Sequence, residues 1–536
     1  MKQIKPIFII SLPRSGSTLL QRLMLGHSSI DSCGEPWLAL PLMTQVKDEC
    51  IIANYGHRSA ARSIQAYLEG TPRGKDVYYE ASRKFLLDLY AARAKENIEY
   101  FRNKETPKKD WMIGTEHEKF IFNLESYDPV SYHGESGIEK LLLILKENSG
   151  WKPIYEKSNI IGLIADDKSS ISLEPGGQFE LSGAALKNLH MTCQETGIHL
   201  KELRNALSKL NLGMAGFGFH PLSSRNDFKF MPKGRYEIMK RWMPKVGSMG
   251  LDMMLRTCTI QVNLDYSSEL DMVRKFKTAI TLQPVVTALF ANSPFYEGKP
   301  SNFLSFRTEV WRHTDKARCG VPSCVFEDNF GYEQWVDYLL DVPMYFIYRN
   351  EHYYDVAGSS FNDFINGKLK NAVGFRPTIK DWEDHMSVAF TDVRLKGYLE
   401  MRGADGGPWD RICALPAIWA GLLYDETALK ASEEIANKIN YEEVIESTYL
   451  AAKVGMQAKI GKFKINELAS EILHISKSGL HNRNELNSSD ENETGYLSPL
   501  FSMVEEKRTL ADEMLESYHS SWNKRVELAF KNQMIN

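Results

Sequence analysis

The chain has few of the features that mark membrane, secreted and nucleic-acid-binding proteins. No apolar run approaches the roughly 18 residues that a membrane-spanning helix needs. The seven cysteines are an odd number scattered from Cys33 to Cys413, which does not fit a secreted disulfide framework. The net charge is only −4, which argues against a general nucleic-acid binder. The sequence therefore predicts neither a membrane nor a nucleic-acid partner.

The beginning of the chain does not resemble a secretory leader. Its apolar segment Ile7–Leu12 is followed by Pro-Arg-Ser-Gly rather than by a small-residue cleavage site. Together with the missing membrane span, this predicts a cytoplasmic location. Hydrophobic residues make up 43% of the chain and charged residues 25%, so a substantial core is expected. The 536 residues suffice for roughly two to four domains of average size, or for one large domain.

Two composition regimes meet near residue 103. Before that point, an apolar strand at 6–10 runs into a polar loop and then into an apolar helix start. After residue 110, strands and helices follow one another without regular alternation, which predicts a mixed, largely antiparallel sheet with helices against one face. The predicted domains are residues 1–103 and residues 104–536, the second with a helical C-terminal part after Ala414.

Apolar spacing predicts several helices in the larger domain. Asp271 is the expected N-cap of one of them, and a loop-rich segment is expected at 298–330. The predicted helices are 138–146, 185–210, 271–291, 465–480 and 509–530.

Four short stretches place polar side chains on alternate residues, which is a strand signal. They are 114–118, 174–181, 261–265 and 398–402. Their polar positions carry acids and amides, including Glu116, Glu118, Glu174, Glu180 and Glu400.

Five carboxylates on one sheet face would repel one another unless cations lie between them. Oxygen ligands on rigid strands suit Mg²⁺, which phosphoryl-transfer sites use to neutralise nucleotide charge. The alternative for any single acid is a solvated strand face or a neighbouring arginine. The pattern as a whole predicts an enzyme that handles a metal–nucleotide.

Seven ordered segments resemble glutamate–cysteine ligases of the plant and alphaproteobacterial type, and the resemblance runs from about residue 104 to the end. The segments are GTEHEKF (114–120), SLEPGGQFELSG (172–183), MPKGRYEIMKRWMPKVG (231–247), GLDMMLRTCTIQVNLDYSSE (250–269), LFANSPFYEGKP (289–300), DVPMYFIYR (341–349) and VRLKGYLEMRGADGGPWDRICALPA (393–417).

The resemblance implies an α+β fold of the glutamine synthetase and glutamate–cysteine ligase superfamily, with a curved, largely antiparallel sheet forming a funnel surrounded by helices. The implied reaction converts ATP, L-glutamate and L-cysteine into γ-glutamylcysteine, ADP and phosphate through a γ-glutamyl phosphate, with Mg²⁺, as the first step of glutathione synthesis. One alternative is a carboxylate–amine ligase of the same fold with another amine. Another is a non-catalytic homologue, whose mark would be loss of an acidic position, and all five are present.

The resemblance also implies roles for individual residues. The five glutamates would share the Mg²⁺ ions. Arg256 and Arg402, catalytic together with Glu400, would bind the substrate α-carboxylate and the transferred phosphate, because a guanidinium fork matches planar oxyanions. The remaining candidates for substrate or ATP binding are Arg235, Lys245, Gln178, Gln261 and Asn263.

Cys193 and Cys413 match a cysteine pair that forms a regulatory disulfide in the plant enzymes. Val356 and Asn371 stand where a second plant pair would lie, which puts plant-style redox control in doubt. The alternative is two reduced cysteines packed as small apolar residues. The resemblance leaves a homodimer open, since related enzymes can dimerise.

The N-terminal strand, loop and helix form a candidate phosphate cradle. Its backbone amides and helix N-terminus would favour an anion, but the loop lacks the Gly-Lys-Ser/Thr ending of a Walker A motif. Residues 6–36 resemble the start of the sulfotransferase family, in which this loop holds the 5′-phosphosulfate of the donor PAPS. The loop residues are Arg14, Ser15, Gly16, Ser17 and Thr18.

The sulfotransferase resemblance stops near residue 103, before a complete doubly wound sheet. We therefore predict a partial α/β, P-loop-like segment that is an inactive remnant. A weak nucleotide site or an association segment is the alternative for this part. A PAPS-dependent sulfotransferase is the alternative for the whole chain, but the acidic sheet would repel a doubly phosphorylated donor.

Overall fold

The computed structural model describes residue 69 and residues 97–535. The chain divides into two units, Met1–Lys95 and Glu96–Asn536, and the description below concerns the second. The predicted phosphosulfate loop at 14–18 lies outside the described residues.

The second unit is built around a nine-stranded sheet in which every pairing is antiparallel. This confirms the predicted α+β class with a large antiparallel sheet. In spatial order the strands are β14 (Val393–Leu395), β15 (Leu399–Asp405), β7 (Thr259–Leu264), β1 (Ile113–Asn123), β5 (Phe179–Ser182), β4 (Ser170–Leu173), β3 (Asn159–Ile164) and β2 (Lys152–Glu156), and β6 (Leu212–Ala215) also pairs with β1.

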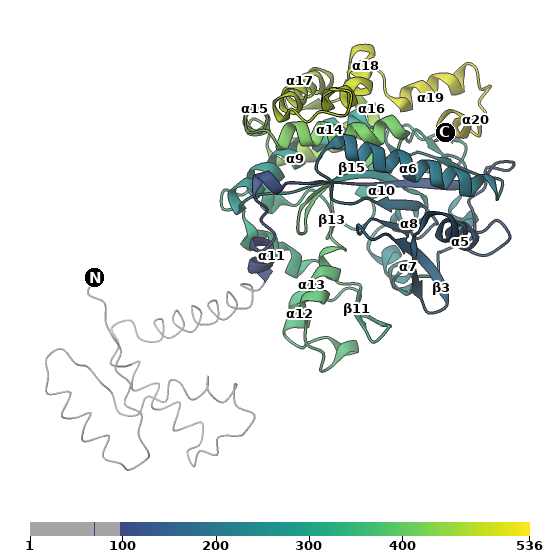
Figure 1. Cartoon of the computed structure of the whole chain (residues 1–536). Helices are drawn as coiled ribbons and strands as arrows, with labels where there is room; N and C mark the ends of the chain where they lie inside the picture. The colour runs from purple at the N-terminus through teal and green to yellow at the C-terminus, as the bar shows by residue number, and fades with distance from the viewer. Residues whose placement is uncertain (1–68, 70–96, 536) are drawn as a thin grey trace, which may run out of the picture. The chain divides into compact units, whose positions relative to one another are not determined.

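Three long helices, α6 (Leu189–Ser208), α9 (Glu269–Leu289) and α14 (Trp409–Leu423), contact the central strands (Figure 1). On β7, the side chains of Ile260, Val262 and Leu264 are fully buried. Successive strand residues point to opposite faces, so the residues between them face the other side of the sheet. The sheet therefore has an apolar side covered by helices and a polar side.

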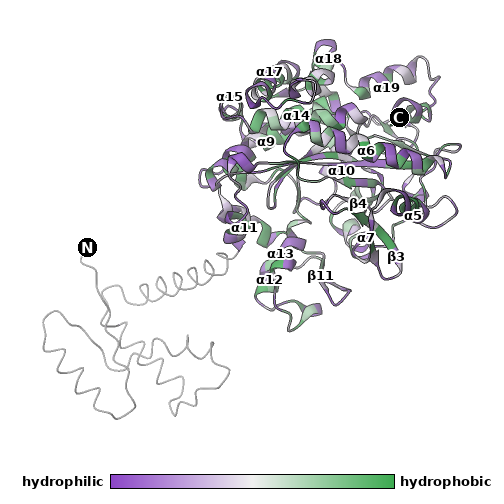
Figure 2. Cartoon of the chain, in the orientation of Figure 1, coloured by the Kyte–Doolittle hydropathy of each residue, from purple (hydrophilic) through white to green (hydrophobic). Residues whose placement is uncertain are grey.

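Helix α14 is buried along almost its whole length, and Figure 2 colours much of it as hydrophobic. No single helix among the described residues is long and apolar enough to cross a membrane. Helices α14 and α15 (Glu426–Ala436) meet that test only as a pair, and the pair is bent by 90°.

The remaining elements surround the sheet. The helices are α5 (Ile138–Ser149), α7 (Gly234–Val246), α8 (Gly250–Arg256), α10 (Phe306–Arg312), α11 (Tyr332–Asp341), α12 (Phe361–Ile365), α13 (Ile379–Met386), α16 (Tyr441–Val454), α17 (Ile465–Arg483), α18 (Ser498–Glu506), α19 (Leu510–His519) and α20 (Leu528–Asn532). The short strand pairs are β8 (Phe295–Tyr296) with β9 (Lys299–Pro300), β10 (Cys319–Gly320) with β13 (Phe390–Thr391), β11 (Phe346–Arg349) with β12 (His352–Asp355), and β16 (Lys459–Ile460) with β17 (Phe463–Lys464).

Most predicted helices are confirmed, as α5, α6, α9 and α17, and two details were wrong. Helix α9 begins two residues early because Ser268, not Asp271, is its N-cap; the Ser268 side chain accepts a hydrogen bond from the Asp271 amide. The segment 298–330 is loop-rich, as predicted, and also contains α10, whose seven residues are too few for a clear apolar period.

The predicted helix at 509–530 is two helices, α19 and α20. Asn523 and Lys524 lie between them with φ of 50° and 62°, in the left-handed region that ends a right-handed helix. Apolar spacing alone does not reveal such a break.

Candidate functional site

A cavity of about 240 Å³ collects the predicted acids. Its walls come from the central sheet, α7, β11, β13 and the segment before β14. The lining side chains are Glu116, Glu118, Glu174, Glu180, Arg235, Tyr236, Met239, Gln261, Phe346, Ser387, Val388, Phe390, Arg394, Lys396, Glu400 and Arg402. All five predicted carboxylates therefore lie in what we call the acidic cavity.

The strand register explains this convergence. Glu118 on β1 lies opposite Glu180 on β5, and Glu116 lies opposite Gln261 on β7. Residues paired across antiparallel strands present their side chains on the same face, about 5 Å apart. Glu400 on β15 extends the row on the far side of β7. The alternation seen in sequence thus becomes one continuous acidic face.

Three of these carboxylates are each oriented by one hydrogen bond. Their second oxygen makes no hydrogen bond within the described part of the chain. The donors are Asn263 Nδ2 to Glu116 (2.7 Å), the Thr259 amide to Glu118 (3.0 Å) and the Ser172 hydroxyl to Glu180 (2.6 Å).

Burial and mutual repulsion raise the pKa values of these acids. Burial raises the pKa of Glu116 to about 7, with further contributions from Glu400 and Glu180. Burial also raises the pKa of Glu118 well above its ordinary value, and the charges of Glu180 and Glu174 add to it. A bound cation would relieve both effects. The cluster therefore has the electrostatics of a cation site.

The donor chemistry fits Mg²⁺, which prefers carboxylate oxygens and completes its shell with water and substrate phosphates. Among residues 97–535, no three His, Cys, Asp or Glu side chains converge closely enough to hold a metal by themselves. A metal in this cavity would thus draw part of its shell from solvent and substrate, as is usual for Mg²⁺.

Glu400 differs from the other acids because its carboxylate already has cationic partners. Arg394 Nε lies 2.6 Å from one oxygen and Arg402 Nη1 lies 3.1 Å from the other. Burial raises the pKa of Glu400, but Arg394, Lys396 and Arg402 outweigh it and hold this pKa below its ordinary value. Glu400 therefore pairs with two guanidinium groups. We call Glu116, Glu118 and Glu180 the open carboxylates, because each keeps one oxygen without a hydrogen bond in the described residues.

Arg402 is one of four cationic side chains that line the acidic cavity beside the carboxylates. We call these four the cationic border. Arg402 Nη1 donates to the side-chain oxygen of Gln261 as well as to Glu400. Arg235, from α7, lines the same cavity. Two cations that the sequence reasoning missed, Arg394 and Lys396, stand there too. They occupy alternate positions on and just after β14, so the alternation that identified Glu400 and Arg402 could have revealed them.

Arg256, predicted as a catalytic residue, is not among the side chains that line the acidic cavity. Its side chain is fully buried and pairs with Asp252 and Glu297, each at 3.0 Å. The guanidinium lies 4.6 Å from the ring centre of Phe219 and 4.8 Å from that of Tyr296. Cation–π contacts and ion pairs of this kind stabilise a buried arginine. Arg256 therefore fixes the end of α8 rather than facing the acids.

Three other predicted residues also do not line the acidic cavity. Gln178 binds the backbone: its Oε1 accepts from the Gly176 amide, and its Nε2 donates to the carbonyls of Met254 and Thr257. It therefore holds the turn between β4 and β5. Lys245 is exposed near the end of α7. Asn263 contacts the site through its hydrogen bond to Glu116.

Cys193 on α6 and Cys413 on α14 form a disulfide with Cα atoms 5.6 Å apart. This separation is within the usual disulfide range. The structure thus favours the paired state over two reduced, packed cysteines. The bond ties together two of the helices that cover the apolar side of the sheet.

We expect reduction of this disulfide to lower the free energy of unfolding by about 2–4 kcal/mol, because the bond closes a long loop in the unfolded chain. Thiol titration with and without reductant should differ by two cysteines, and Cys193→Ser should abolish that difference. Cys324→Ser, which alters a free cysteine, is the matched control. Equal thiol counts in both conditions would contradict the pairing.

Comparison with known proteins gives two family matches. Residues 112–532 match the glutamate-cysteine ligase family 2, and residues 6–132 match a sulfotransferase family. Glutamate–cysteine ligase B, chloroplastic, of Oryza sativa subsp. japonica is 49% identical over 425 residues, which cover 79% of this chain and 84% of the rice protein. The chloroplastic glutamate–cysteine ligase of Nicotiana tabacum is 45% identical over 514 residues, covering 94% and 95%.

Among solved structures, the glutamate–cysteine ligase of Francisella tularensis in complex with AMP has a TM-score of 0.46 at 13% identity, covering 76% of this chain and 85% of that one. This likeness is too distant to support a functional argument. The two family matches overlap at 112–132. That segment includes β1, which the structure places inside the large sheet.

The predicted cytoplasmic location is contradicted by these relatives, which are named as chloroplastic enzymes. The prediction used the absence of an apolar secretory segment. Plastid transit peptides are amphipathic, rich in serine and poor in acids rather than apolar, so that absence could not distinguish a cytoplasmic from a plastid protein.

Proposed function

The chain belongs to glutamate–cysteine ligase family 2, and we propose that it joins the γ-carboxylate of L-glutamate to the amine of L-cysteine at the expense of ATP. The products are γ-glutamylcysteine, ADP and phosphate, and the reaction begins glutathione synthesis. The observation that carries the proposal is the acidic cavity, where five carboxylates and four cationic side chains line one space. The identity of 49% to the rice ligase supports the assignment of substrates.

In this proposal Glu116, Glu118 and Glu180 hold Mg²⁺ through their open oxygens, with Glu174 beside them. The bound metal would neutralise charge on the ATP phosphates. The three carboxylates lie on rigid paired strands and are each fixed by one hydrogen bond. They therefore need little reorganisation as the reaction proceeds. We further propose that the polar side of the sheet is the inner wall of the funnel of this superfamily.

The first chemical step would form a bond between a γ-carboxylate oxygen of glutamate and the γ-phosphorus of ATP, while the bond to ADP breaks. Arg402 is suited to this step because Glu400 and Gln261 fix its guanidinium, leaving other N–H groups for an oxyanion. In the second step, the cysteine amine attacks the γ-carbonyl carbon, phosphate leaves with the bonding electron pair, and the amine loses a proton.

The test is phosphate release by the full-length protein with ATP, Mg²⁺ and L-glutamate, with and without L-cysteine. We expect cysteine-dependent release together with a product of the mass of γ-glutamylcysteine. Release with another amine but not with cysteine would favour a related carboxylate–amine ligase. Absence of release with every amine tested would contradict the proposal.

We propose that residues 1–103 take no part in this chemistry and that the ligase comprises residues 104–536. The open carboxylates and their cationic border all lie beyond residue 103, which supports this division. The sulfotransferase match raises the alternative of PAPS binding. Titration of the full-length chain with PAPS should give no binding heat; a heat signal lost in Arg14→Ala would contradict the remnant assignment.

A further inference from the structure

Helix α7 starts without a capping side chain of its own. Its N-cap residue is Lys233, which makes no side-chain capping hydrogen bond, and lysine is not among the residues that commonly cap helices. The first amides of a helix have no partner inside the helix and need one elsewhere. The Gly234 amide donates to Oε1 of Glu156, the last residue of β2, at 2.6 Å. A carboxylate 78 residues earlier in the chain thus takes the place of a local cap.

The Glu156 carboxylate lies very close to the start of α7. A Cβ atom added to Gly234 would be 2.8 Å from Cδ2 of Tyr353 and 3.0 Å from the Glu156 oxygen. Ordinary carbon–carbon contacts are roughly 3.5–4.0 Å long, so this close approach requires glycine. The Tyr353 hydroxyl, from β12, also donates a long hydrogen bond of 3.5 Å to the other Glu156 oxygen. Glu156 therefore joins β2, the start of α7 and β12.

The first turn of α7 is also tied to the strand that leads to Glu174. The Lys233 ammonium and the Tyr236 hydroxyl both donate to the carbonyl of Leu173, at 2.8 and 2.6 Å. Leu173 ends β4 and directly precedes Glu174, which is a carboxylate of the acidic cavity. The start of α7 is thus held from two different strands, by Leu173 and by Glu156.

The residue between these attachments is Arg235. It directly follows Gly234 and lines the acidic cavity. Its guanidinium lies over the Tyr236 ring, 5.2 Å from the ring centre, and its buried Nε has no hydrogen-bond partner in the described part of the chain. Buried polar groups are normally hydrogen-bonded. Arg235 therefore has a donor available for an anionic ligand.

The anion that suits Arg235 is a phosphate that arrives with a metal ion. Five carboxylates line the same cavity and would repel an anion that comes alone. The phosphates of ATP carry Mg²⁺, which pairs with those carboxylates. The α-carboxylate of an amino acid brings no divalent cation.

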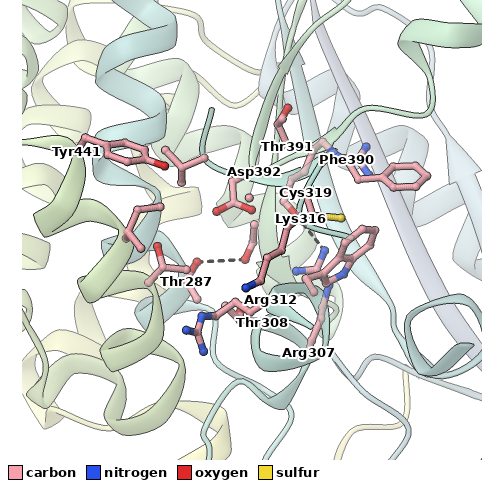
Figure 3. A pocket seen from close by; sticks show the side chains of 17 residues that line it. Thr287, Arg307, Thr308, Arg312, Lys316, Cys319, Phe390, Thr391, Asp392 and Tyr441 are labelled. Atoms are coloured by element: carbon pink, nitrogen blue, oxygen red, sulfur yellow. Dashed lines mark hydrogen bonds between the residues drawn. The ribbon is translucent and has the colours of Figure 1, made fainter. Parts of the chain in front are cut away.

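Arg235 does not line the second cavity that borders the acidic one. This second cavity, of about 290 Å³, shares Arg402 and Phe390 with the acidic cavity, and Figure 3 shows the side chains that line it. A change that is passed on through Arg235 should therefore affect a ligand of the acidic cavity rather than one confined to the second cavity.

We propose that Glu156 is a positioning residue for ATP: its carboxylate fixes the Gly234 amide and thereby directs the Arg235 guanidinium toward the phosphate chain. The inference rests on the proposed ligase function, because that function supplies ATP as the ligand. Glu156 is not among the side chains that line the acidic cavity, so it acts through α7 and not by contact with the substrates.

Steady-state kinetics of the full-length enzyme test this role. Glu156→Ala should raise the KM of ATP by about 10- to 100-fold, because a misplacement of roughly 1 Å can cost about 100-fold. The KM values of glutamate and cysteine should change by less than about twofold, a small difference on this scale. Glu147→Ala, at an exposed position on α5, is the matched control and should change none of the three. An unchanged KM of ATP in Glu156→Ala would overturn the proposal.

A conservative variant separates the hydrogen bond from the charge. Glu156→Gln keeps a side-chain oxygen that can accept from the Gly234 amide. It should restore the KM of ATP to within about fivefold of the wild type, the remainder being the loss of a negative charge at a helix N-terminus. A KM of ATP as high as that of Glu156→Ala would contradict positioning through this hydrogen bond.

A double variant shows whether Glu156 acts through Arg235. Arg235→Gln removes the guanidinium that Glu156 is proposed to direct. The double variant Glu156→Ala, Arg235→Gln should therefore have the same KM of ATP as Arg235→Gln alone, because residues that act as one unit are not additive. Multiplication of the two single effects would show that Glu156 acts independently of Arg235 and would overturn the proposal.

Gly234→Ala should disturb the same contact from the side of the helix. Its added methyl group would push against Tyr353 and Glu156, so the KM of ATP should rise while those of the amino acids stay unchanged. Gly197→Ala on α6 is the matched control, because no atom lies within 4 Å of a Cβ added there. An equal KM of ATP in both glycine variants would contradict the close coupling of Glu156 and α7.

Calorimetry with Mg²⁺ and without amino acids separates a lost phosphate contact from general damage to the site. In the wild-type protein, ATP should bind more tightly than adenosine, which lacks the phosphates. Glu156→Ala should weaken the binding of ATP and leave that of adenosine unchanged. A merely structural change would weaken both ligands equally, and this result would overturn the proposal.

These outcomes are distinguishable from a failure of the proposed function. If the wild-type protein makes γ-glutamylcysteine but Glu156→Ala keeps its KM of ATP, only the role of Glu156 is misassigned. If the wild type makes no γ-glutamylcysteine, the ligase proposal fails, and calorimetry with ATP and adenosine still judges Glu156. A selective loss of ATP binding in Glu156→Ala would then support the positioning role, and absence of ATP binding in the wild type would overturn it.

Discussion

Glu118→Gln and Glu180→Gln should each lower the rate of cysteine-dependent phosphate release by at least about 100-fold, which is the upper range for loss of an outer partner of a metal-binding group. Each substitution removes a negative charge from the open row of carboxylates. It also replaces a carboxylate by a neutral amide, which is a poorer ligand for a cation. The Mg²⁺ concentration needed for half-maximal rate should rise in both variants.

These two variants should be at least as stable as the wild type, although their activity falls. Burial and neighbouring acids raise the pKa of both Glu118 and Glu180 in the folded protein. A raised carboxyl pKa means that ionisation costs folding free energy as pH rises through the unfolded and then the folded pKa. Glutamine mimics the protonated form, so the melting temperature at pH 8 without Mg²⁺ should be equal to or higher than that of the wild type.

Thermal unfolding and initial rates measured on the same preparations check this prediction. Glu147→Gln, at an exposed position on α5, is the control and should change neither quantity. Near-wild-type turnover of both variants at saturating Mg²⁺ would show that the open carboxylates do not hold the metal. A lost activity accompanied by a lower melting temperature would indicate damage to the fold instead.

The acidic site was accessible from sequence because strand alternation is local. Glu116 and Glu118 are two residues apart on one strand and must share a face, and the same holds for Glu400 and Arg402. Local alternation does not predict the register between strands that are distant in the sequence. The pairing of Glu118 with Glu180 joins residues far apart in the chain and was not predicted; only their place on a common face was expected, from the charge pattern and the family resemblance.

Arg256 has a position that the sequence pattern did not predict. It lies three residues before β7, and its type suits an oxyanion site, but proximity along the chain does not set the direction of a side chain. A different local signal was present: Asp252 precedes it by four residues, the helical spacing for an ion pair, and the structure makes that pair. Gln178 likewise follows a Pro-Gly-Gly bend, and its amide is used to hold that bend.

Arg402→Gln should lower the rate of ligation by about 100- to 1,000-fold, the range found when one preorganised donor is removed from a site of developing charge. Arg402 is held in place by Glu400 and Gln261 and lines the acidic cavity. In the proposed reaction, its loss would therefore affect the transferred phosphate. The variant should also unfold at a lower temperature, because one oxygen of the buried Glu400 loses its cationic partner.

A double variant separates these two effects. In Arg402→Gln with Glu400→Gln, the unpaired negative charge is gone, while Arg394 can still donate to the remaining side-chain oxygen at position 400. We expect the melting temperature to recover relative to Arg402→Gln, while the rate stays low. Recovery of the rate together with the melting temperature would show that Arg402 acts only by supporting the fold. Persistent inactivity in a restabilised protein, when the single variant Glu400→Gln retains activity, would place the Arg402 guanidinium in contact with the reacting groups.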